Sequence, residues 1–311
     1  MKKEVSGALD ARQTNEWGKY LKHLNWRAVK IEKTHIFLRQ LPLIDRAMIK
    51  IQHPVGPVNL NKIDQFAKKE KALFTIIEPH NKGFIESDYI KHGYIVSKIQ
   101  FAHSATIKID LTQSEEKIYS AFSTNAKRNI RKAEGRLSIK TIALNDEKNI
   151  TAIQQFYSMY ATTGKEKKFY VPSYEEVSAK MQAFKKTSYT LFAYEKDSQE
   201  KEQKPVAALW IGYFDNVLVY FHPGNTKRGY ELLANYLLVW EALKLGKKLG
   251  LKVFDFETMY DYRYPKKNKA WKGYTEFKKK FGGEEVYYPQ SWIKFYNPIF
   301  RLLYSFTTFF S

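Results

Sequence analysis

Apolar and polar positions along the chain predict alternating strands and helices. Residues 72–78 form a continuous apolar run that is typical of a buried strand, and residues 105–111 alternate like a strand with one exposed face. Residues 113–123 show a helical pattern. A longer helix is predicted over 229–249, where lysines in the last turn precede Gly250. Further strands are predicted at 188–195, 206–213, 217–221 and 251–256.

The first hundred residues carry a shorter version of the same content. Helices are predicted near 60–70 and 86–92, on either side of the strand that ends at Glu78. We therefore predict a mixed α/β (α+β) fold with two domains of similar plan, each a mixed central sheet flanked by helices. The join between the two domains is expected near residues 103–106.

Charge and composition narrow the classes of partner. The 311 residues include 52 Lys and Arg against 32 Asp and Glu, a formal charge of +20. Such an excess attracts nucleic-acid phosphates or an anionic membrane surface, although a lysine-rich compositional bias is an alternative explanation. The absence of cysteine excludes disulfides, cysteine-ligated zinc and thiol nucleophiles. No signal peptide is visible and no run of about 18 apolar residues occurs, so we expect a cytoplasmic protein.

Two basic segments are candidates for chemistry. In the helix predicted over 125–135, a 3.6-residue period gathers four cations on one face, which indicates a large polyanionic partner. These cations are Lys127, Arg128, Arg131 and Lys132. The second segment is Phe277-Lys278-Lys279-Lys280, before a Gly-Gly turn. A lysine on a strand that lines a cleft would stabilise an oxyanion or hold a phosphate, whereas a solvated charge run is the plainer alternative.

Other candidate sites have weaker signals. The turn 222–229 carries Lys227 and Arg228 at a helix start, where anions bind, although any strand–helix turn uses similar residues. Glu78 ends a buried strand, where its carboxylate would orient or deprotonate an amine, or else cap a neighbouring helix. The seven histidines have no ligand-like spacing, so we expect no metal site.

The C-terminal tail is amphipathic. Ile299, Leu302, Leu303, Phe306 and Phe310 recur at helical spacing, and Pro298 is suited to open that helix. One interpretation is a terminal helix that packs on its own domain. The other is contact with a membrane interface through residues 292–311, where aromatic and basic side chains gather.

Five motifs in order resemble the Fem aminoacyltransferases (FemA, FemB and FemX), which build the cross-bridges of peptidoglycan. The likeness spans nearly the whole chain. The motifs are Glu16-Trp17-Gly18, Gly56-Pro57-Val58, Arg128-Asn129-Ile130-Arg131-Lys132-Ala133, the stretch 236–242 followed by Gly250 and Asp255-Phe256, and 277–283.

The resemblance implies two GNAT-like domains that face a cleft. They would be residues 1–105, completed by 291–311, and residues 106–290. It implies transfer of an amino acid from aminoacyl-tRNA to an amine of a peptidoglycan precursor, either lipid II or a UDP-linked muropeptide. We expect a monomer that needs no metal or nucleotide cofactor.

The resemblance also assigns site residues. Lys278, after Phe277, and Glu78 take the catalytic positions. Lys19, Phe277 and the stretch with Lys167 and Lys168 take the positions that bind the substrate, the peptidoglycan precursor. In the stretch with Lys167 and Lys168, lysine replaces an arginine of the family. Lysine binds a phosphate as a point charge and cannot form the bidentate hydrogen bonds of an arginine.

Two departures from the family pattern stand out. Glu257 replaces a glycine that often follows the Asp-Phe strand, and the coiled-coil arm of the larger members is missing. Two other functions stay open: a GNAT-like N-acyltransferase that uses acyl-CoA or acyl carrier protein, and a non-catalytic RNA-binding protein. If the acceptor is lipid-linked, the protein works at the inner face of the cell membrane.

Overall fold

The computed structural model describes residues 9–81, 83–145, 150–196, 204–265 and 271–306. Their contacts divide the chain into two compact units. We call Ala105–Val286 the central unit, and Leu9–Ser104 together with the described part of Tyr287–Ser311 the flanking unit. The sequence-based division placed these junctions after residues 105 and 290. No helix within the described ranges has the length and apolar character needed to cross a membrane.

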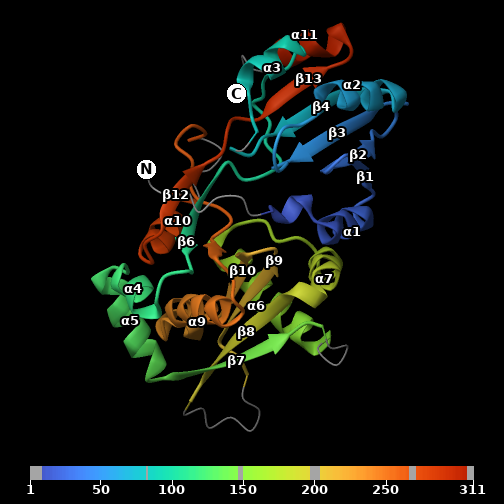
Figure 1. The fold of residues 1–311 in the computed structure, drawn as a ribbon. Helices are drawn as coiled ribbons and strands as arrows, with labels where there is room; N and C mark the ends of the chain where they lie inside the picture. Colours follow the sequence, from blue (N-terminus) through green and yellow to red (C-terminus); the bar gives the residue numbers. More distant parts are fainter. Residues whose placement is uncertain (1–8, 82, 146–149, 197–203, 266–270, 307–311) are drawn as a thin grey trace. The chain divides into compact units, whose positions relative to one another are not determined.

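The flanking unit is built on a six-stranded mixed sheet with the order β1-β2-β3-β4-β13-β5. Only β3 and β4 run parallel; the other neighbours are antiparallel (Figure 1). The C-terminal strand β13 lies between β4 and β5. The strands are β1 (Arg27–Ile31), β2 (Thr34–Gln40), β3 (Ala47–Gln52), β4 (Ala72–Glu78), β5 (Ile95–Val96) and β13 (Trp292–Phe295).

Helices cover this sheet because their apolar sides pack on its strands. Leu60, Ile63 and Ala67 of α2 and Tyr89 of α3 join strand residues in one hydrophobic core. The helices are η1 (Ala11–Gln13), α1 (Asn15–His23), α2 (Leu60–Lys69), α3 (Glu86–Lys91) and α11 (Pro298–Phe306). Trp292, which one of the two interpretations of the tail placed at a membrane interface, is a buried strand residue in this core, so the other interpretation, packing on its own domain, holds for this residue.

The central unit is built on a seven-stranded mixed sheet with the order β12-β6-β11-β10-β9-β8-β7. β10 and β11 run parallel and are joined by helices, whereas β6 pairs antiparallel with β11. The strands are β6 (Ala105–Asp110), β7 (Leu137–Ala143), β8 (Ser188–Glu195), β9 (Ala207–Phe214), β10 (Val217–Asn225), β11 (Val253–Asp255) and β12 (Glu284–Tyr287).

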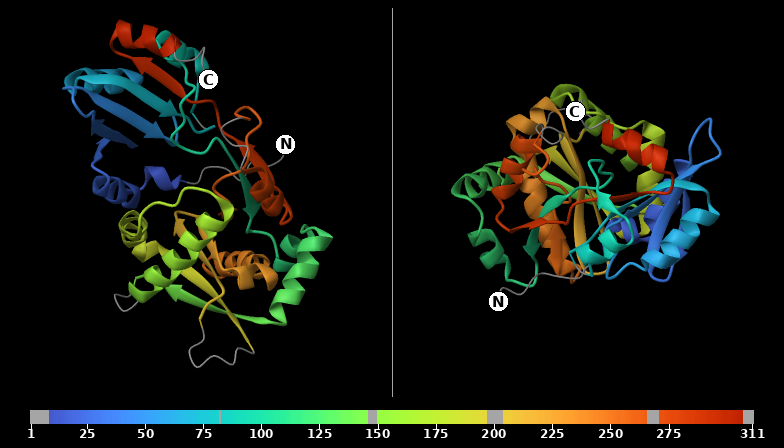
Figure 2. Two further views of the ribbon diagram at one scale, coloured as in Figure 1. Left: turned by 180° about the vertical axis from the view of Figure 1, so that it is seen from behind. Right: turned by 90° about the horizontal axis from the view of Figure 1, so that it is seen from above.

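Helices cover both faces of the central sheet (Figure 2). On one face, Phe156 of α6 packs on Trp210 of β9. On the other face, Gly246 of α9 lies against Leu218 of β10. Leu218 pairs with Tyr213, which is three residues from Trp210 on β9 and therefore points to the opposite face. The helices are α4 (Glu115–Ser120), α5 (Thr124–Glu134), α6 (Ile150–Lys167), α7 (Tyr174–Ala183), η3 (Lys185–Thr187), α8 (Lys227–Glu231), α9 (Ala234–Lys248) and α10 (Lys272–Lys279).

The prediction of two mixed sheets flanked by helices is confirmed. Three local predictions are wrong. The helix predicted over 229–249 is two helices, because Leu233 adopts a left-handed φ of 61° between them. β10 extends to Asn225, so most of the predicted turn 222–229 is strand or helix. Lys278 lies on helix α10 and not on a strand.

Candidate active site

The candidate site in the central unit is assembled at the end of β11. Asp255, the last residue of this strand, accepts hydrogen bonds from Thr106 Oγ1 (2.5 Å) and from the backbone N–H of Glu257 (2.7 Å). Lys108 on the neighbouring β6 lies 3.7 Å from its second carboxylate oxygen. These contacts hold the carboxylate of Asp255 and shape the turn that follows it, residues 256–258.

Lys278 fills the space beside this turn. Its Nζ donates to the carbonyl oxygens of Phe256 (2.7 Å) and Thr258 (2.6 Å), and to Thr258 Oγ1 at 3.3 Å. The same Nζ lies 3.9 Å from the centroid of the Tyr274 ring, within cation–π range. The side chain is fully buried (0% exposed). The alternative of a solvated charge run is therefore wrong for Lys278.

Burial changes the acid–base behaviour of this lysine. Removal from water lowers the pKa of Lys278 from 10.5 to about 7, although the nearby carboxylates of Glu257 and Asp255 favour the charged form. The amine therefore exchanges a proton near neutral pH, as a general acid or base must. Burial also raises the pKa of Tyr274, which keeps this phenol neutral.

The neighbouring lysines behave differently. Lys279 is exposed and pairs with Glu285 at 2.7 Å, and Lys280 donates to the Tyr236 hydroxyl at 3.1 Å. Phe277 packs edge-on against Tyr236 and Phe281, so it anchors α10. Helical geometry thus turns only one of the three lysines into the interior.

Glu257 is the residue whose importance sequence reasoning left unexplained. It has a left-handed φ of 67° and is buried, although glutamate rarely adopts this backbone conformation. Its position between the two carbonyl groups that bind Lys278 brings a negative charge next to the amine. A glycine would meet the backbone requirement without strain, so the glutamate side chain is a distinctive addition to this site.

Glu78 lies in the flanking unit and has a different environment from the one predicted. Its Oε1 accepts from the backbone N–H groups of Phe101 (2.5 Å) and Ala102 (2.8 Å), and its Oε2 accepts from Gln52 Nε2 (3.2 Å). The carboxylate therefore holds a loop and does not cap a helix. Its predicted action on an amine stays a prediction.

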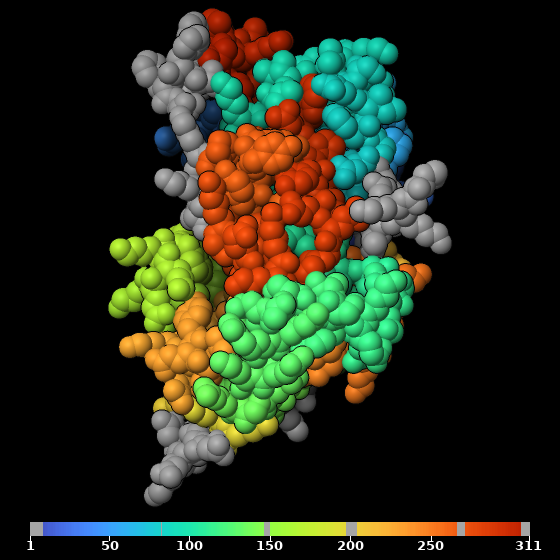
Figure 3. All heavy atoms as spheres, turned by 90° about the vertical axis from the view of Figure 1, so that its left-hand side faces the viewer, coloured from blue at the N-terminus to red at the C-terminus, as the bar shows by residue number. Residues whose placement is uncertain are grey.

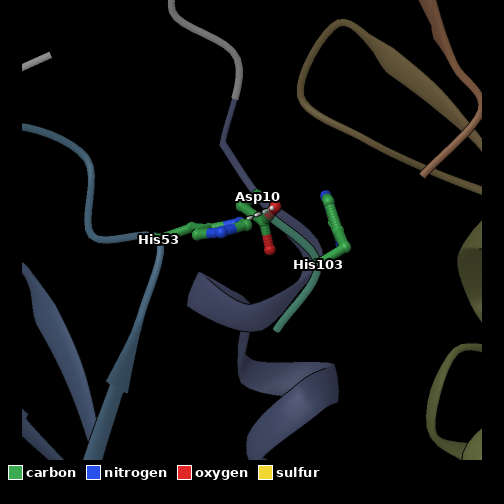
Figure 4. A group of neighbouring side chains, drawn as sticks. All are labelled: Asp10, His53 and His103. Carbon is green, nitrogen blue, oxygen red and sulfur yellow. Dashed lines mark hydrogen bonds and ion pairs between the residues drawn. The ribbon is translucent and has the colours of Figure 1, made fainter. Parts of the chain in front are cut away.

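Three histidines that the sequence analysis set aside pack around Tyr288. The ring centroids of His53, His80 and His103 lie 4.3, 5.3 and 5.6 Å from that of Tyr288. Figure 4 shows His53 directed at Asp10, with His103 beside them. These distances could not be read from the sequence because the three histidines come from separate loops.

Asp10, His53 and His103 each offer a metal-ligand atom, and these atoms lie within 4.8 Å of one another. However, Asp10 Oδ1 accepts from the Arg12 backbone (2.8 Å) and guanidinium (3.0 Å), and its Oδ2 faces His53 Nδ1 at 2.9 Å. Burial opposes ionisation of Asp10, but Arg12 and His53 hold its pKa well below the usual range. Because the guanidinium already serves this carboxylate, the cluster fits a structural anchor better than a cation site.

The predicted polyanion-binding residues lie mainly on surfaces. In α5, the Ser123 hydroxyl caps the helix start, while Ile130 and Ala133 are buried and Arg128, Arg131 and Lys132 are exposed. Lys127 donates to the carbonyl of Ser120 at 2.7 Å, so it is partly committed to the fold. Helix α5 (green) forms part of the surface of the central unit (Figure 3).

The other predicted binding residues are dispersed. Lys19 is exposed on α1, and Lys167 at the end of α6 places its Nζ 4.6 Å from the centroid of Tyr230. Lys168 is exposed just after that helix. Lys227 is exposed, but Arg228 is paired with Glu195 and Glu231. Gly229 is needed for packing, because an added Cβ would lie 2.3 Å from the Val206 carbonyl oxygen. These contacts explain the turn without a bound anion.

A comparison with family models decides the family. Residues 120–278, just over half of the 311, match the model described as the acetyltransferase (GNAT) domain. The chain belongs to the GNAT family. This protein is accordingly an acyltransferase in the broad sense, which includes aminoacyl transfer. The matched segment begins before α5 and ends at Lys278, so it contains the whole basic helix and the buried lysine.

Several solved structures have the same fold over nearly the whole length of this protein. FemX is similar with a TM-score of 0.79 at 13% identity, covering 95% of this chain and 94% of that one. L-PGS from Bacillus licheniformis has a TM-score of 0.60 at 14% identity, with 91% and 90% covered. The C-terminal domain of a putative lysylphosphatidylglycerol synthetase from Agrobacterium fabrum has a TM-score of 0.60 at 11% sequence identity, covering 94% of this chain and 90% of that one. No curated protein matches. The Fem resemblance is thus confirmed in the fold.

Proposed function

We propose that this GNAT protein transfers an amino acid from aminoacyl-tRNA to an amine of a peptidoglycan precursor. The observation that carries the proposal is the full burial of the Lys278 amine, which lowers its pKa to about 7. The sequence resemblance assigns this residue to the catalytic position of the Fem family. The ordered Fem motifs and the FemX-like fold support it.

The proposed reaction exchanges one covalent bond for another and requires two proton transfers. The acceptor amine attacks the carbonyl carbon of the aminoacyl ester, a C–N bond forms, and the C–O bond to the tRNA ribose breaks. The amine loses a proton and the ribose oxygen gains one. A group with a pKa of about 7 is suited to take the first proton and return it, and Lys278 is such a group.

The charge of the chain suits these substrates. Both tRNA and the phosphate-bearing precursor are polyanions, and the exposed Arg128, Arg131 and Lys132 supply a cationic helix face. We propose that this face contacts tRNA phosphates, and that Lys19, Lys167 and Lys168 contact the precursor.

Membrane contact forms part of the same proposal. Ile299, Leu302 and Leu303 of α11 are each more than half exposed (65%, 58% and 52%), and the described helix carries no acidic residue. An apolar helix side beside a net positive charge suits an anionic lipid surface. A lipid-linked acceptor would place the protein there, in the cytoplasm at the inner face of the membrane.

A second candidate is an N-acyltransferase that uses acyl-CoA or acyl carrier protein, which the GNAT family model favours. The third candidate, a non-catalytic RNA-binding protein, is less consistent with membership of an enzyme family. Donor chemistry separates the first two, because only the aminoacyl donor is a tRNA ester.

The experiment is a transfer assay with radiolabelled amino acids on a mixture of charged tRNAs. The acceptor is a UDP-linked muropeptide in one arm and lipid II in vesicles in the other. We expect label in the muropeptide, and a loss of about 100-fold or more in kcat for Lys278→Met. Lys279→Met, an exposed neighbour on the same helix, is the matched control. Turnover of acyl-CoA without transfer from any charged tRNA would favour the second candidate.

A further inference from the structure

Polar side chains form a stripe across one face of the sheet in the flanking unit. Arg39 on β2 pairs with Met48 on β3, and Lys50 and Gln52 follow Met48 at alternate positions. Gln52 in turn pairs with Glu78 on β4. Because alternate residues and cross-strand partners share a face, Arg39, Lys50, Gln52 and Glu78 lie on one side. The opposite side carries the apolar core, with Ile49 and Ile51.

Lys50 is the member of this stripe whose amine has no protein acceptor among the described residues. It is buried (8% exposed) on the central part of the sheet. Among the described residues, no oxygen accepts a hydrogen bond from its Nζ and no carboxylate pairs with it within 4 Å. Removal of most of the side chain from water lowers the pKa of Lys50 to about 8, although the charge of Glu78 favours the ammonium form. Arg12 and Arg39 act in the same direction as burial.

Aromatic rings form walls beside this amine. Its Nζ lies 4.1 Å from the ring centroid of the buried Trp26 and 5.7 Å from that of Phe101. Phe101 is 42% exposed, so solvent reaches this wall. Glu78 holds the wall in place, because its carboxylate binds the backbone N–H of Phe101. The loop contact of Glu78 therefore positions part of the same site.

A second unmet hydrogen bond narrows the class of ligand. Gln52 Nε2 donates to Glu78, which fixes the orientation of the amide, and Gln52 Oε1 is buried without a donor among the described residues. The stripe thus lacks an acceptor for Lys50 and a donor for Gln52. A carboxylate with a neighbouring amide N–H supplies both, whereas a phosphate supplies only the acceptor.

We propose that Lys50, between Trp26 and Phe101, binds the carboxylate of a peptide C-terminus or of an N-acylated amino acid. If the proposed function holds, this carboxylate belongs to the stem peptide of the acceptor, and only this source of the ligand rests on the proposed function. The binding site itself rests on the contacts of the flanking unit.

The test is a calorimetric titration of the full chain at pH 8.5. The probes are N-acetylalanyl-alanine, its C-terminal amide, and methyl phosphate. The proteins are the wild type, Lys50→Met, Phe101→Ala and, as an exposed matched control on the same sheet, Lys30→Met. Repeating the titration in two buffers of different ionisation enthalpy measures proton uptake, because a carboxylate that binds Lys50 stabilises its ammonium form.

The expected result is that the free acid binds, the amide binds at least about tenfold more weakly, and binding takes up a fraction of a proton. Lys50→Met should lose both the affinity and the proton uptake, Phe101→Ala should weaken binding, and Lys30→Met should bind normally. Equal binding of acid and amide, unchanged binding by Lys50→Met, or no binding to the wild type would overturn the proposal. Binding of methyl phosphate alone would overturn the assignment to a carboxylate. None of these readings needs transfer activity, so failure here is distinct from failure of the proposed function.

Discussion

Lys278 makes a quantitative prediction about stability against pH. Its pKa is about 7 in the folded chain and 10.5 as an unperturbed lysine. Below pH 7 both states hold the proton, so stability does not depend on this group. Between pH 7 and 10.5 the unfolded state binds more protons than the folded state, so the free energy of unfolding rises with pH. The full difference corresponds to about 5 kcal/mol, and about 2 kcal/mol of it falls between pH 7 and 9.

The perturbation that isolates this effect is Lys278→Met, which keeps an unbranched side chain but ends one atom short of the lysine and removes the amine. Methionine leaves the carbonyl groups of Phe256 and Thr258 without their donor, which costs about 1 to 3 kcal/mol each at every pH. That loss is a constant offset and does not affect the slope. Groups that titrate alike in both proteins cancel in the difference between wild type and variant.

The assay is urea unfolding of both proteins at pH 6.5, 7, 8 and 9. We expect the advantage of the wild type to be constant up to pH 7 and then to grow by about 2 kcal/mol by pH 9. Lys279→Met should follow the wild type throughout, because that side chain is exposed. A difference that stays flat from pH 7 to 9 would show that Lys278 keeps an ordinary pKa, and its proposed role in proton transfer would fail.

Three other regions give predictions of their own. The Glu257→Gly variant should be more stable than Glu257→Ala by about 1 kcal/mol in urea unfolding, since both remove the carboxylate but only glycine adopts a φ of 67° without strain; equal stability of the two variants would argue against strain. Replacing Arg128, Arg131 and Lys132 by Gln should weaken tRNA binding and reduce the slope of log K against log salt by up to about 3, which filter binding at several salt concentrations measures; an unchanged slope would remove α5 from the interface. Leu302→Ser with Leu303→Ser should reduce sedimentation with anionic vesicles without changing the melting temperature, and retained sedimentation would exclude α11 as the contact.

Local patterns were enough to predict many elements but not their spatial order. The strand 72–78 agrees with β4 and the basic helix with α5, because apolar runs and caps are read from neighbouring residues. β13 could not be placed from its own four residues, since its position between β4 and β5 depends on long-range pairing. The break at Leu233 was missed because leucine is a good helix former and its left-handed φ leaves no local signal.

The candidate site shows the same division. Lys278 was found through its motif, but its helix and its burial depend on packing against residues 256–258. Lys50 was missed because the strand that carries it, β3, was not among the predicted elements. The signal that was present is its position two residues before Gln52 in a strand that is otherwise largely apolar, which predicts a polar side chain directed at a covered face.

The contacts of Lys278 also limit how it can act. An ammonium has three N–H donors, and this one meets three oxygen acceptors, at Phe256, Thr258 and the Thr258 hydroxyl. In its charged form the side chain therefore has no donor left for an oxyanion. Once deprotonated it gains a lone pair, which can accept a proton from an attacking amine. If Lys278 acts as a base, kcat should rise as pH increases through about 7. If it donates a hydrogen bond to the oxyanion, kcat should fall over the same range, so a pH profile of the transfer reaction distinguishes the two roles.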